Sequence, residues 1–432
     1  MPDIERQRRK DCFTDDFAIS AWSPPVHPFP RTAAATVGQR PCSPSSDPPK
    51  RQEPEFMYAQ ILRDILVDIG STKEEMIEFC REKCAGNKVD LNYIDEFEEY
   101  YTPRNAIFWY TRDSFLYRVL NKALREQDID ILYSLRYFIK DFHLQLEELS
   151  RREEPIPPEP TIPDTSNSMI VTVYRGQLMN NEEFDRKIRF NAEGFFSVSP
   201  FLSTTFHRHL AAVYAGDRRS GEESSHQNIL FQIDINSQVN KFPYADISEY
   251  SAFEKVEAEV LFTMGAVFRI HSVVKSDERW IVKLKLTNEE DEDLASLTKY
   301  MREEITHLML FPLSKLANLM LAMRKYEQAE RFYLGLLRDP KMTKDFGVLS
   351  AFHNNLGKAY SELNKPIKAI EQYQQSCEIK IKHFGETSPA LAPTFNNLGQ
   401  LYYEQKDYDK ALEYYNKALH VHPSVDKEIA VI

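Results

Sequence analysis

The feature that most constrains the fold is a repeat near the end of the chain. Asn354-Asn-Leu-Gly357 recurs 42 positions later as Asn396-Asn-Leu-Gly399, and Ala369-Ile-Glu-Gln-Tyr373 recurs at the same shift as Ala411-Leu-Glu-Tyr-Tyr415. A looser copy begins earlier, at Lys325. Each copy has the pattern of two helices joined by a polar turn. Because one such pair cannot cover its own apolar face, pairs at a fixed period stack into an α-solenoid, which we expect over residues 308–425.

The repeated motif resembles the tetratricopeptide repeats, in the longer-period form seen in kinesin light chains. The last two copies carry the resemblance most clearly. It implies a concave groove that binds a protein or a peptide. The alternative is that the array is only a packing appendage, since three repeats are the minimum for a stable array.

The chain before the repeats changes character three times. Residues 1–52 are rich in Pro, Ser, Arg and Thr and lack apolar periodicity, which predicts a disordered leader. Apolar residues at helical spacing predict a helical lobe over 53–150. β-Branched and aromatic runs predict a β-rich lobe over 169–287, followed by a linker helix at 288–307. The fold class is therefore α+β followed by an α-solenoid.

Within the β-rich lobe, runs bounded by Gly, Pro and polar residues locate the individual elements. Strands are expected at residues 169–174, 228–235, 259–262, 266–275 and 280–286, and strands with turns over residues 194–205. Short helices are expected at residues 180–189 and 209–214.

Bulk composition excludes some classes of function. The formal net charge of −12 argues against a general nucleic-acid binder, which usually carries a basic surplus. No run of about 18 apolar residues is present, so no membrane partner is expected. The N-terminus has no apolar core of a secretory signal. We therefore expect a soluble protein of the cytoplasm.

The cysteines point the same way. Five cysteines scattered over 432 residues do not form a disulfide framework, which favours a reducing compartment. Cys80 and Cys84 lie four apart in an expected helix, and no second Cys/His pair stands nearby. We expect buried thiols there, and no metal site.

A pair of acidic residues, Glu257 and Glu259, precedes the apolar run Val260-Leu-Phe262. In an extended strand, residues i and i+2 point the same way, so both carboxylates are expected side by side. Such a pair can stabilise a developing cation with one member and take a proton with the other. The plainer interpretation is the solvated face of an ordinary strand, because surface glutamates are common.

Two further motifs bear on this choice. Tyr174-Arg175-Gly176 ends one expected strand, and Phe201-Leu-Ser-Thr-Thr205 ends another. Taken singly, the arginine is typical of a surface ion pair, and the hydroxyl run of a turn capped by Ser203 or Thr205. The order of the three motifs, with β elements between them, carries the information.

That order resembles the Arg–Ser–Glu class of mono-ADP-ribosyltransferases, in particular the arginine-specific family, over about residues 55–287. The family pattern is an arginine after a strand, then Ser-Thr-Ser, then Glu-x-Glu; Thr205 replaces the second serine here. Tyr110-Thr111 with Phe115, Asn121 and Ala123-Leu-Arg125 also resemble the N-terminal lobe of the family. The resemblance implies a fold in which two small sheets cradle NAD beside a helical lobe.

The resemblance also implies the site. The catalytic residues it implies are Arg175, Ser203, Glu257 and Glu259. The residues it implies for contact with NAD are Tyr110, Arg175, Gly176, Ser203, Thr204 and Glu259. Those it implies for contact with the acceptor are Phe253 and Glu257. Glu259 would stabilise the ribose cation, and Glu257 would grip the acceptor guanidinium and take its proton. Phe253 is equally well explained as a core aromatic.

The function predicted from the sequence is transfer of ADP-ribose from NAD, as substrate and without a metal, to arginine side chains of an acceptor protein. The repeats would recruit a target or a regulator. One alternative is a scaffold whose transferase domain is inactive. The other is an NAD glycohydrolase, in which water replaces arginine.

Overall fold

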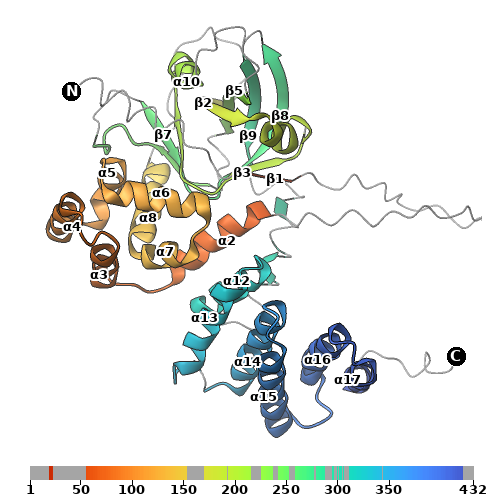
Figure 1. Cartoon of the computed structure of the whole chain (residues 1–432). Helices are drawn as coiled ribbons and strands as arrows, with labels where there is room; N and C mark the ends of the chain where they lie inside the picture. The colour runs from red at the N-terminus through yellow and green to blue at the C-terminus, as the bar shows by residue number, and fades with distance from the viewer. Residues whose placement is uncertain are drawn as a thin grey trace, which may run out of the picture. The chain divides into compact units, whose positions relative to one another are not determined.

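The computed structural model describes residues 19–22, 55–152, 170–191, 193–215, 225–236, 242–252, 258–276, 279–287, 294–295, 299, 301–303, 305, 311–342 and 344–421. The chain divides into two compact units: residues 1–63 with 70–298, and residues 64–69 with 299–432 (Figure 1). The first unit holds a helical lobe and a sheet, and the second holds paired helices.

The helical lobe forms where apolar residues recur at helical spacing. Its helices are α2 (Glu55–Asp68), α3 (Lys73–Lys83), α4 (Lys88–Tyr100), η1 (Pro103–Asn105), α5 (Ala106–Thr111), α6 (Phe115–Glu126), α7 (Ile129–Ser134) and α8 (Arg136–Arg152). The buried rings of Phe97, Trp109 and Phe138 pack together, with centroids 5.0 Å apart for Phe97–Trp109 and 6.3 Å for Phe97–Phe138. Cys80 and Cys84 are buried free thiols, as expected, and burial raises the pKa of Cys80 to about 12.

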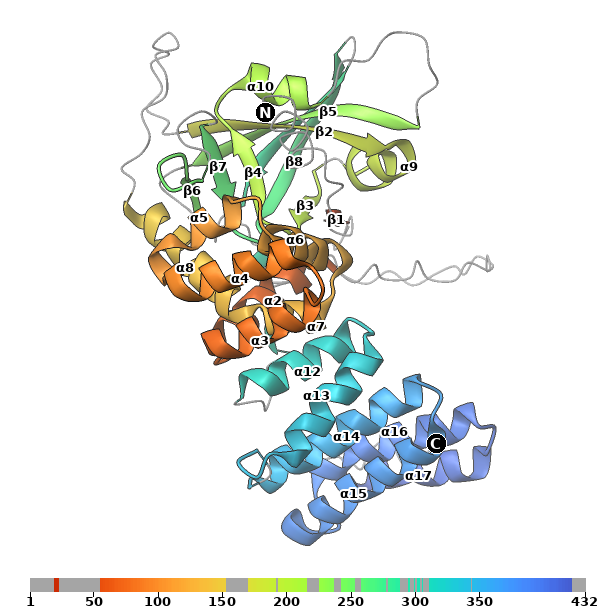
Figure 2. The same cartoon turned by 60° about the vertical axis from the view of Figure 1, so that its left-hand side comes forward.

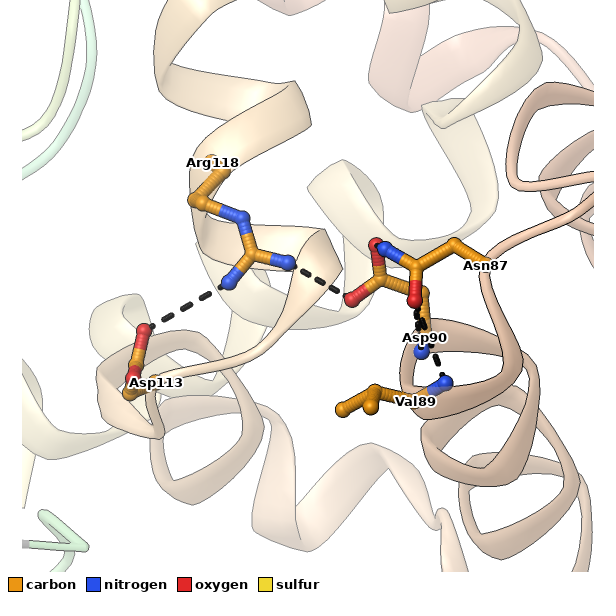
Figure 3. A network of polar contacts seen from close by, with 5 residues as sticks. All are labelled: Asn87, Val89, Asp90, Asp113 and Arg118. Carbon is orange, nitrogen blue, oxygen red and sulfur yellow. Dashed lines mark hydrogen bonds and ion pairs between the residues drawn. The ribbon is translucent and has the colours of Figure 1, made fainter.

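A polar network fastens α4 to α6 (Figure 3). The side-chain oxygen of Asn87 accepts from the backbone N–H groups of Val89 and Asp90 at 3.1 and 3.3 Å and so caps the start of α4. Asp90 in turn accepts from Arg118 Nη2 of α6 at 2.6 Å, and Arg118 Nη1 lies 3.6 Å from Asp113. The cap and the ion pairs fix the start of both helices.

The sheet follows the helical lobe. Its strands are β1 (Ile19–Trp22), β2 (Ile170–Asn180), β3 (Phe195–Val198), β4 (Leu202–Thr205), β5 (His226–Asn236), β6 (Tyr244–Asp246), β7 (Glu259–Phe262), β8 (Val267–Ser276) and β9 (Arg279–Leu286). They form a nine-stranded sheet in the order β1-β3-β8-β9-β5-β2-β4-β7-β6. The β5–β9 pair is parallel, and the other pairs are antiparallel. Between the strands lie α9 (Asn181–Phe184), η2 (Asp185–Arg189) and α10 (Arg208–Tyr214).

The expectation of two separate small sheets is wrong for the described strands, which are continuous. The continuity depends on one place, because β2 pairs with β4 through the partners Tyr174 and Thr205, whereas it pairs with β5 from Ile170 to Asn180. Six strands thus lie on one side of this connection and three on the other. One residue pair therefore joins two parts of the sheet, β1-β3-β8-β9-β5-β2 and β4-β7-β6, which we call its wings.

The disordered leader is also contradicted at one place. Residues Ile19–Trp22 form β1, which pairs antiparallel with β3, from Ile19 opposite Val198 to Trp22 opposite Phe195. The backbone hydrogen bonds of an edge strand are available to any sequence, so a segment without apolar periodicity can still add to a sheet. The rest of residues 1–52 lies outside the described residues.

The helical lobe joins the sheet at the turn between β7 and β8. Arg63 Nη1 of α2 donates to the Met264 carbonyl at 3.2 Å, and His143 Nδ1 of α8 lies 2.9 Å from Thr263 Oγ1. Thr263 and Met264 are buried. The lobe and the end of β7 are therefore one packed structure, which matters because β7 begins at Glu259.

The second unit is built from consecutive helices: α12 (Pro312–Ala322), α13 (Tyr326–Arg338), α14 (Phe346–Glu362), α15 (Pro366–Phe384), η4 (Pro389–Leu391), α16 (Ala392–Glu404) and α17 (Tyr408–Val421). The repeated glycines and tyrosines meet inside the pairs. A Cβ on Gly357 would lie 2.7 Å from the Tyr373 ring, and one on Gly399 would lie 2.7 Å from the Tyr415 ring. The sequence repeat is thus a repeated helix–helix contact. Of the expected linker helix at 288–307, the described residues 294–295, 299, 301–303 and 305 are helical.

Candidate active site

A row of three residues crosses the connection between the two wings of the sheet. Tyr174 of β2 is the partner of Thr205 of β4, and Thr205 is the partner of Glu259 of β7. Partners across antiparallel strands have Cα atoms about 5 Å apart and side chains on the same face. Glu259 therefore begins its strand about 10 Å from Tyr174, the residue before Arg175.

Ser203 lies on the same face as Glu259. It is two residues before Thr205 in β4, and side chains alternate along a strand. Ser203 Oγ is buried and has no hydrogen-bond partner among the described residues. Most buried hydroxyls are satisfied, so an unsatisfied one calls for an explanation, and a ligand is one candidate partner.

Arg175 follows Tyr174 in β2, and its guanidinium reaches the backbone of β4. Its side chain is 1% exposed, and Nη1 donates to the Ser203 carbonyl oxygen at 2.7 Å. A guanidinium offers five N–H donors in a planar fork, and a buried one is rare because burying a charge is costly. The structure thus places Arg175, Ser203 and Glu259 on three neighbouring strands, although they are 28 and 56 positions apart along the chain.

Gly176 has a packing role in addition to its place beside Arg175. Helix α10 packs against β2 (Figure 2). A Cβ on Gly176 would lie 1.8 Å from the Ala211 carbonyl oxygen. Thr205 Oγ1 accepts from the backbone N–H of His207 at 3.2 Å and so shapes the entry to α10. The expectation that Thr205 serves as a turn hydroxyl is met.

Thr204 points to the other face of β4. Its side chain is 0% exposed, and its hydroxyl donates to the Val260 carbonyl at 2.8 Å. This bond explains a hydroxyl at position 204 through strand pairing, and the buried side chain does not favour the predicted contact with NAD.

The expected arrangement of the two glutamates needs correction. Glu257 and Phe253 lie outside the described residues. Strand β7 begins at Glu259, and the residue before it, Ala258, has φ of +42°. A left-handed residue interrupts the alternation of an extended strand. The argument that both carboxylates point the same way because they share a strand is therefore wrong.

Tyr110 occupies an aromatic cluster. Its ring stacks on Phe142 with centroids 4.3 Å apart and lies 5.6 Å from Phe201, and its hydroxyl donates to Asn121 Oδ1 at 3.1 Å. The side chain is 5% exposed. Its predicted place beside the nicotinamide stays a prediction.

One contact near the site was not foreseen. The hydroxyl of Thr111, the last residue of α5, accepts from the backbone N–H of Ala252 at 2.9 Å. These residues are 141 positions apart, and no local pattern in the sequence signals such a pair. The contact ties the helical lobe to the segment that leads into β7.

Two absences concern the described residues. They contain no cluster of three or more His, Cys, Asp or Glu side chains able to hold a metal ion. Within the same part of the chain, no helix combines the length and apolar character needed to cross a membrane.

Comparison with known proteins gives one family match. Residues 348–423 match a family model described as tetratricopeptide repeat. The matched segment runs from α14 to α17, so the predicted repeats are confirmed there. No curated protein matches the chain.

Similar solved structures are of two kinds. The Vis toxin, an ADP-ribosyltransferase from Vibrio splendidus, shares 15% identity over 53% of this chain and 92% of its own, with a TM-score of 0.27. The C3 exoenzyme of Clostridium limosum shares 15% over 49% and 95%, with a TM-score of 0.30. BtubC (BKLC) from P. vanneervenii shares 24% over 32% and 59%, with a TM-score of 0.25. Because these TM-scores are low, the description of the site rests on the residues of this chain alone.

Proposed function

We propose that the first unit transfers ADP-ribose from NAD to arginine side chains of proteins and releases nicotinamide. The observation that carries the proposal is the placement of Arg175, Ser203 and Glu259 on three neighbouring strands, with Arg175 bonded to the Ser203 carbonyl. Their order resembles that of the arginine-specific ADP-ribosyltransferases.

The residues suit NAD as a substrate. A guanidinium binds the oxygens of a pyrophosphate with paired donors, which suits Arg175 to the centre of NAD. Ser203 Oγ, buried and without a partner among the described residues, has the capacity to bind the nicotinamide side. Arg175 directly follows Tyr174 in β2, and Ser203 lies two residues before Thr205 in β4. In this proposal one NAD molecule spans the place where β2 pairs with β4.

The first chemical step breaks the bond between the ribose C1′ and the nicotinamide nitrogen. The bonding electron pair leaves with nicotinamide, which becomes neutral, and the ribose becomes oxocarbenium-like. A fixed carboxylate close to that sugar stabilises the charge as it develops, and Glu259 supplies it in this proposal. The first residue of a paired strand is a rigid position for such a group.

The second step forms a bond between C1′ and a guanidinium nitrogen of the acceptor. The acceptor arginine is protonated at ordinary pH, so a base must take one proton as the nitrogen attacks. Glu257 has this role in the proposal. The products are the ADP-ribosylated arginine, nicotinamide and one proton.

The test is a transfer assay with labelled NAD and agmatine, a small guanidine that stands in for arginine. We expect Glu259→Gln to lose both transfer and nicotinamide release by about a hundredfold or more, because the cation loses its counter-charge. Glu257→Gln should lose transfer but keep nicotinamide release. Glu182→Gln, at an exposed position in α9, is the matched control and should behave as wild type.

The outcomes separate the alternatives. Nicotinamide release without labelled agmatine in the wild type would indicate an NAD glycohydrolase. If the wild type, purified and folded, neither releases nicotinamide nor labels agmatine, the transferase proposal fails and the scaffold remains.

The repeats are proposed to bind a protein or peptide that the transferase acts on. A row of amides links successive pairs: Asn355 Nδ2 donates to Asn318 Oδ1 at 3.0 Å, and Asn397 Nδ2 to Asn354 Oδ1 at 3.2 Å. Amides in a row can hold an extended backbone. Asn355→Leu with Asn397→Leu should lower labelling of proteins in a cell extract and leave labelling of agmatine unchanged; equal loss of both would contradict a recruiting role.

A further inference from the structure

Helix α17, in the last described pair of the repeat array, carries an exposed apolar stripe. Tyr408, Leu412 and Leu419 are 58%, 63% and 57% exposed, and Tyr415, which is half-buried, lies between the two leucines. Successive members are four, three and four residues apart, so they follow one side of the helix, as the seam of a two-helix contact does. Ala418 is 4% exposed and lies on the side that packs inside the repeat. The stripe is therefore a second apolar face of α17.

The 42-residue repeat shows what covers the same face one pair earlier. Leu419 corresponds to Cys377 of α15, which is only 9% exposed. Beside it, Ser376 Oγ lies 3.3 Å from Thr394 Oγ1, so the next helix of the array, α16, covers this side of α15. Repeats of this kind bury their apolar faces by stacking, and the outer face of a terminal pair is polar in a soluble array. The stripe on α17 is instead apolar, and it suits one further helix.

We propose that this helix is α17 of a second copy of the chain, packed antiparallel about a two-fold axis at the middle of the stripe. Tyr408 of each copy then packs on Leu419 of the other, and Leu412 packs on Tyr415. A two-fold contact uses the same surface on both copies, so the stripe must complement itself, and the pair closes without extending into a fibre. The pairing involves only the second unit and does not depend on the proposed transferase activity.

The charges beside the stripe favour the antiparallel arrangement. Asp409 lies in the first turn of α17 and His420 in the last. They are eleven residues apart, which is about three turns, so both lie on the same flank of the stripe. Among the described residues Asp409 has no ion-pair partner, whereas both lysines of α17 are in ion pairs.

Antiparallel packing places Asp409 of each copy beside His420 of the other. It also sets the two helix dipoles against each other, which is favourable. A parallel pair would instead bring the two aspartates together at one end and the two histidines at the other. The second copy thus supplies a partner of the right charge at both ends of the stripe.

Sedimentation of the full chain at concentrations from about 1 to 100 µM measures the pairing, because one helix on one helix is a small interface and therefore a weak one. We expect the wild type to pass from monomer to dimer over this range. Leu412→Glu with Leu419→Glu should raise the dissociation constant by about tenfold or more, because it puts charges into the contact. Ile367→Glu, at a 74% exposed position of α15 outside the stripe, is the matched control and should pair as the wild type does.

Folding is checked on the same samples. Leu412, Leu419 and Ile367 are all exposed in the single chain, so each variant should keep the far-UV circular dichroism of the wild type. A loss of pairing at unchanged helix content is then a loss of the contact itself.

A charge swap tests the antiparallel arrangement. Asp409→Lys alone and His420→Glu alone each bring like charges together and should raise the dissociation constant by about twofold or more at low salt. The double variant restores opposite charges and should pair at least as tightly as the wild type.

Three outcomes overturn the inference. A wild type that stays monomeric up to about 100 µM would leave the stripe to another segment or another protein. A dimer that Leu412→Glu with Leu419→Glu does not weaken would be held by a different surface. A double charge variant that pairs no more tightly than the weaker single variant would exclude the antiparallel arrangement.

Discussion

Gly176 lies so close to Ala211 that a Cβ on it would stand 1.8 Å from the Ala211 carbonyl oxygen. The contact is backbone against backbone, between the strand that carries Arg175 and α10. Neither side can give way by rotating a side chain. The glycine after the candidate arginine is therefore required by packing, whatever its part in binding NAD.

Gly176→Ala should destabilise the first unit by about 1–3 kcal/mol or more, because it overpacks a fixed contact. All three tryptophans lie in that unit, so urea unfolding followed by tryptophan fluorescence measures it. Gly335→Ala is the matched control, since no atom lies within 4 Å of a Cβ there and the residue is inside α13. It should leave the fluorescence midpoint of the first unit unchanged and stabilise the second unit by about 0.5–1 kcal/mol, which far-UV circular dichroism measures. Equal midpoints for Gly176→Ala and wild type would contradict the packing role.

The repeat contact predicts a coupled pair of substitutions. A Cβ on Gly357 would lie 2.7 Å from the ring of Tyr373, so Gly357→Ala should cost about 1–3 kcal/mol in the second unit. Tyr373→Leu removes the ring and leaves room for the added methyl. The double variant should lose less free energy of unfolding than the two single variants lose together, by about 0.5–3 kcal/mol. Far-UV circular dichroism during urea unfolding measures the difference, and strict additivity would contradict the contact.

Ala258 predicts a dependence on side-chain branching. Its φ of +42° costs an ordinary L-residue about 1–2 kcal/mol, and a β-branched residue more. Ala258→Val should therefore lower the free energy of unfolding of the first unit by about 1–2 kcal/mol relative to wild type. Ala258→Gly should change it by less than about 1 kcal/mol, since relief of strain is offset by greater freedom of the unfolded chain. Equal fluorescence midpoints for the valine and glycine variants would show that the left-handed conformation is absent in solution.

Much of the sheet could be predicted because its long strands carry β-branched runs. β5, β7, β8 and β9 lie where such runs stand, as does the start of β2. β6 and β1 are short strands without a run of their own, so their pairing comes from the strands beside them. The helices α14–α17 followed from the repeat of 42 residues, because a repeated contact leaves a repeated motif.

The site could be predicted in outline and not in detail. The order of the three motifs predicts that Arg175, Ser203 and Glu259 come together, and the structure places these residues on three neighbouring strands, β2, β4 and β7. The left-handed Ala258 gave no signal, because alanine has no preference for that conformation. The bond between Thr111 and Ala252 joins distant segments and depends on how the lobe docks on the sheet. Contacts of this kind need the tertiary structure.

Lys380 of α15 predicts how the stability of the second unit changes with pH. The side chain is 7% exposed and donates to Thr394 Oγ1 at 2.7 Å, and burial lowers its pKa to about 8 from an ordinary 10.5. Between those values the unfolded chain binds a proton that the folded chain does not, so stability rises with pH. Cys377 opposes this, because burial raises its pKa from 9.0 to about 11 and stability falls as pH rises through that range. The net rise should therefore appear between about pH 8 and pH 9, at about 1 kcal/mol per pH unit.

The substitution Lys380→Met tests whether the Lys380 amine makes stability rise with pH. Below pH 8 the folded protein holds a buried charge that methionine removes, so the variant should be more stable than wild type at pH 7 by about 1–3 kcal/mol. Its advantage should shrink as the pH rises to 9, because the wild-type amine then becomes neutral in the folded state. Lys382→Met, at an exposed position in the same helix, is the control and should keep the wild-type pH dependence. Urea unfolding followed by circular dichroism at each pH gives the comparison. A constant difference between Lys380→Met and wild type from pH 7 to pH 9 would mean that the amine does not titrate in this range.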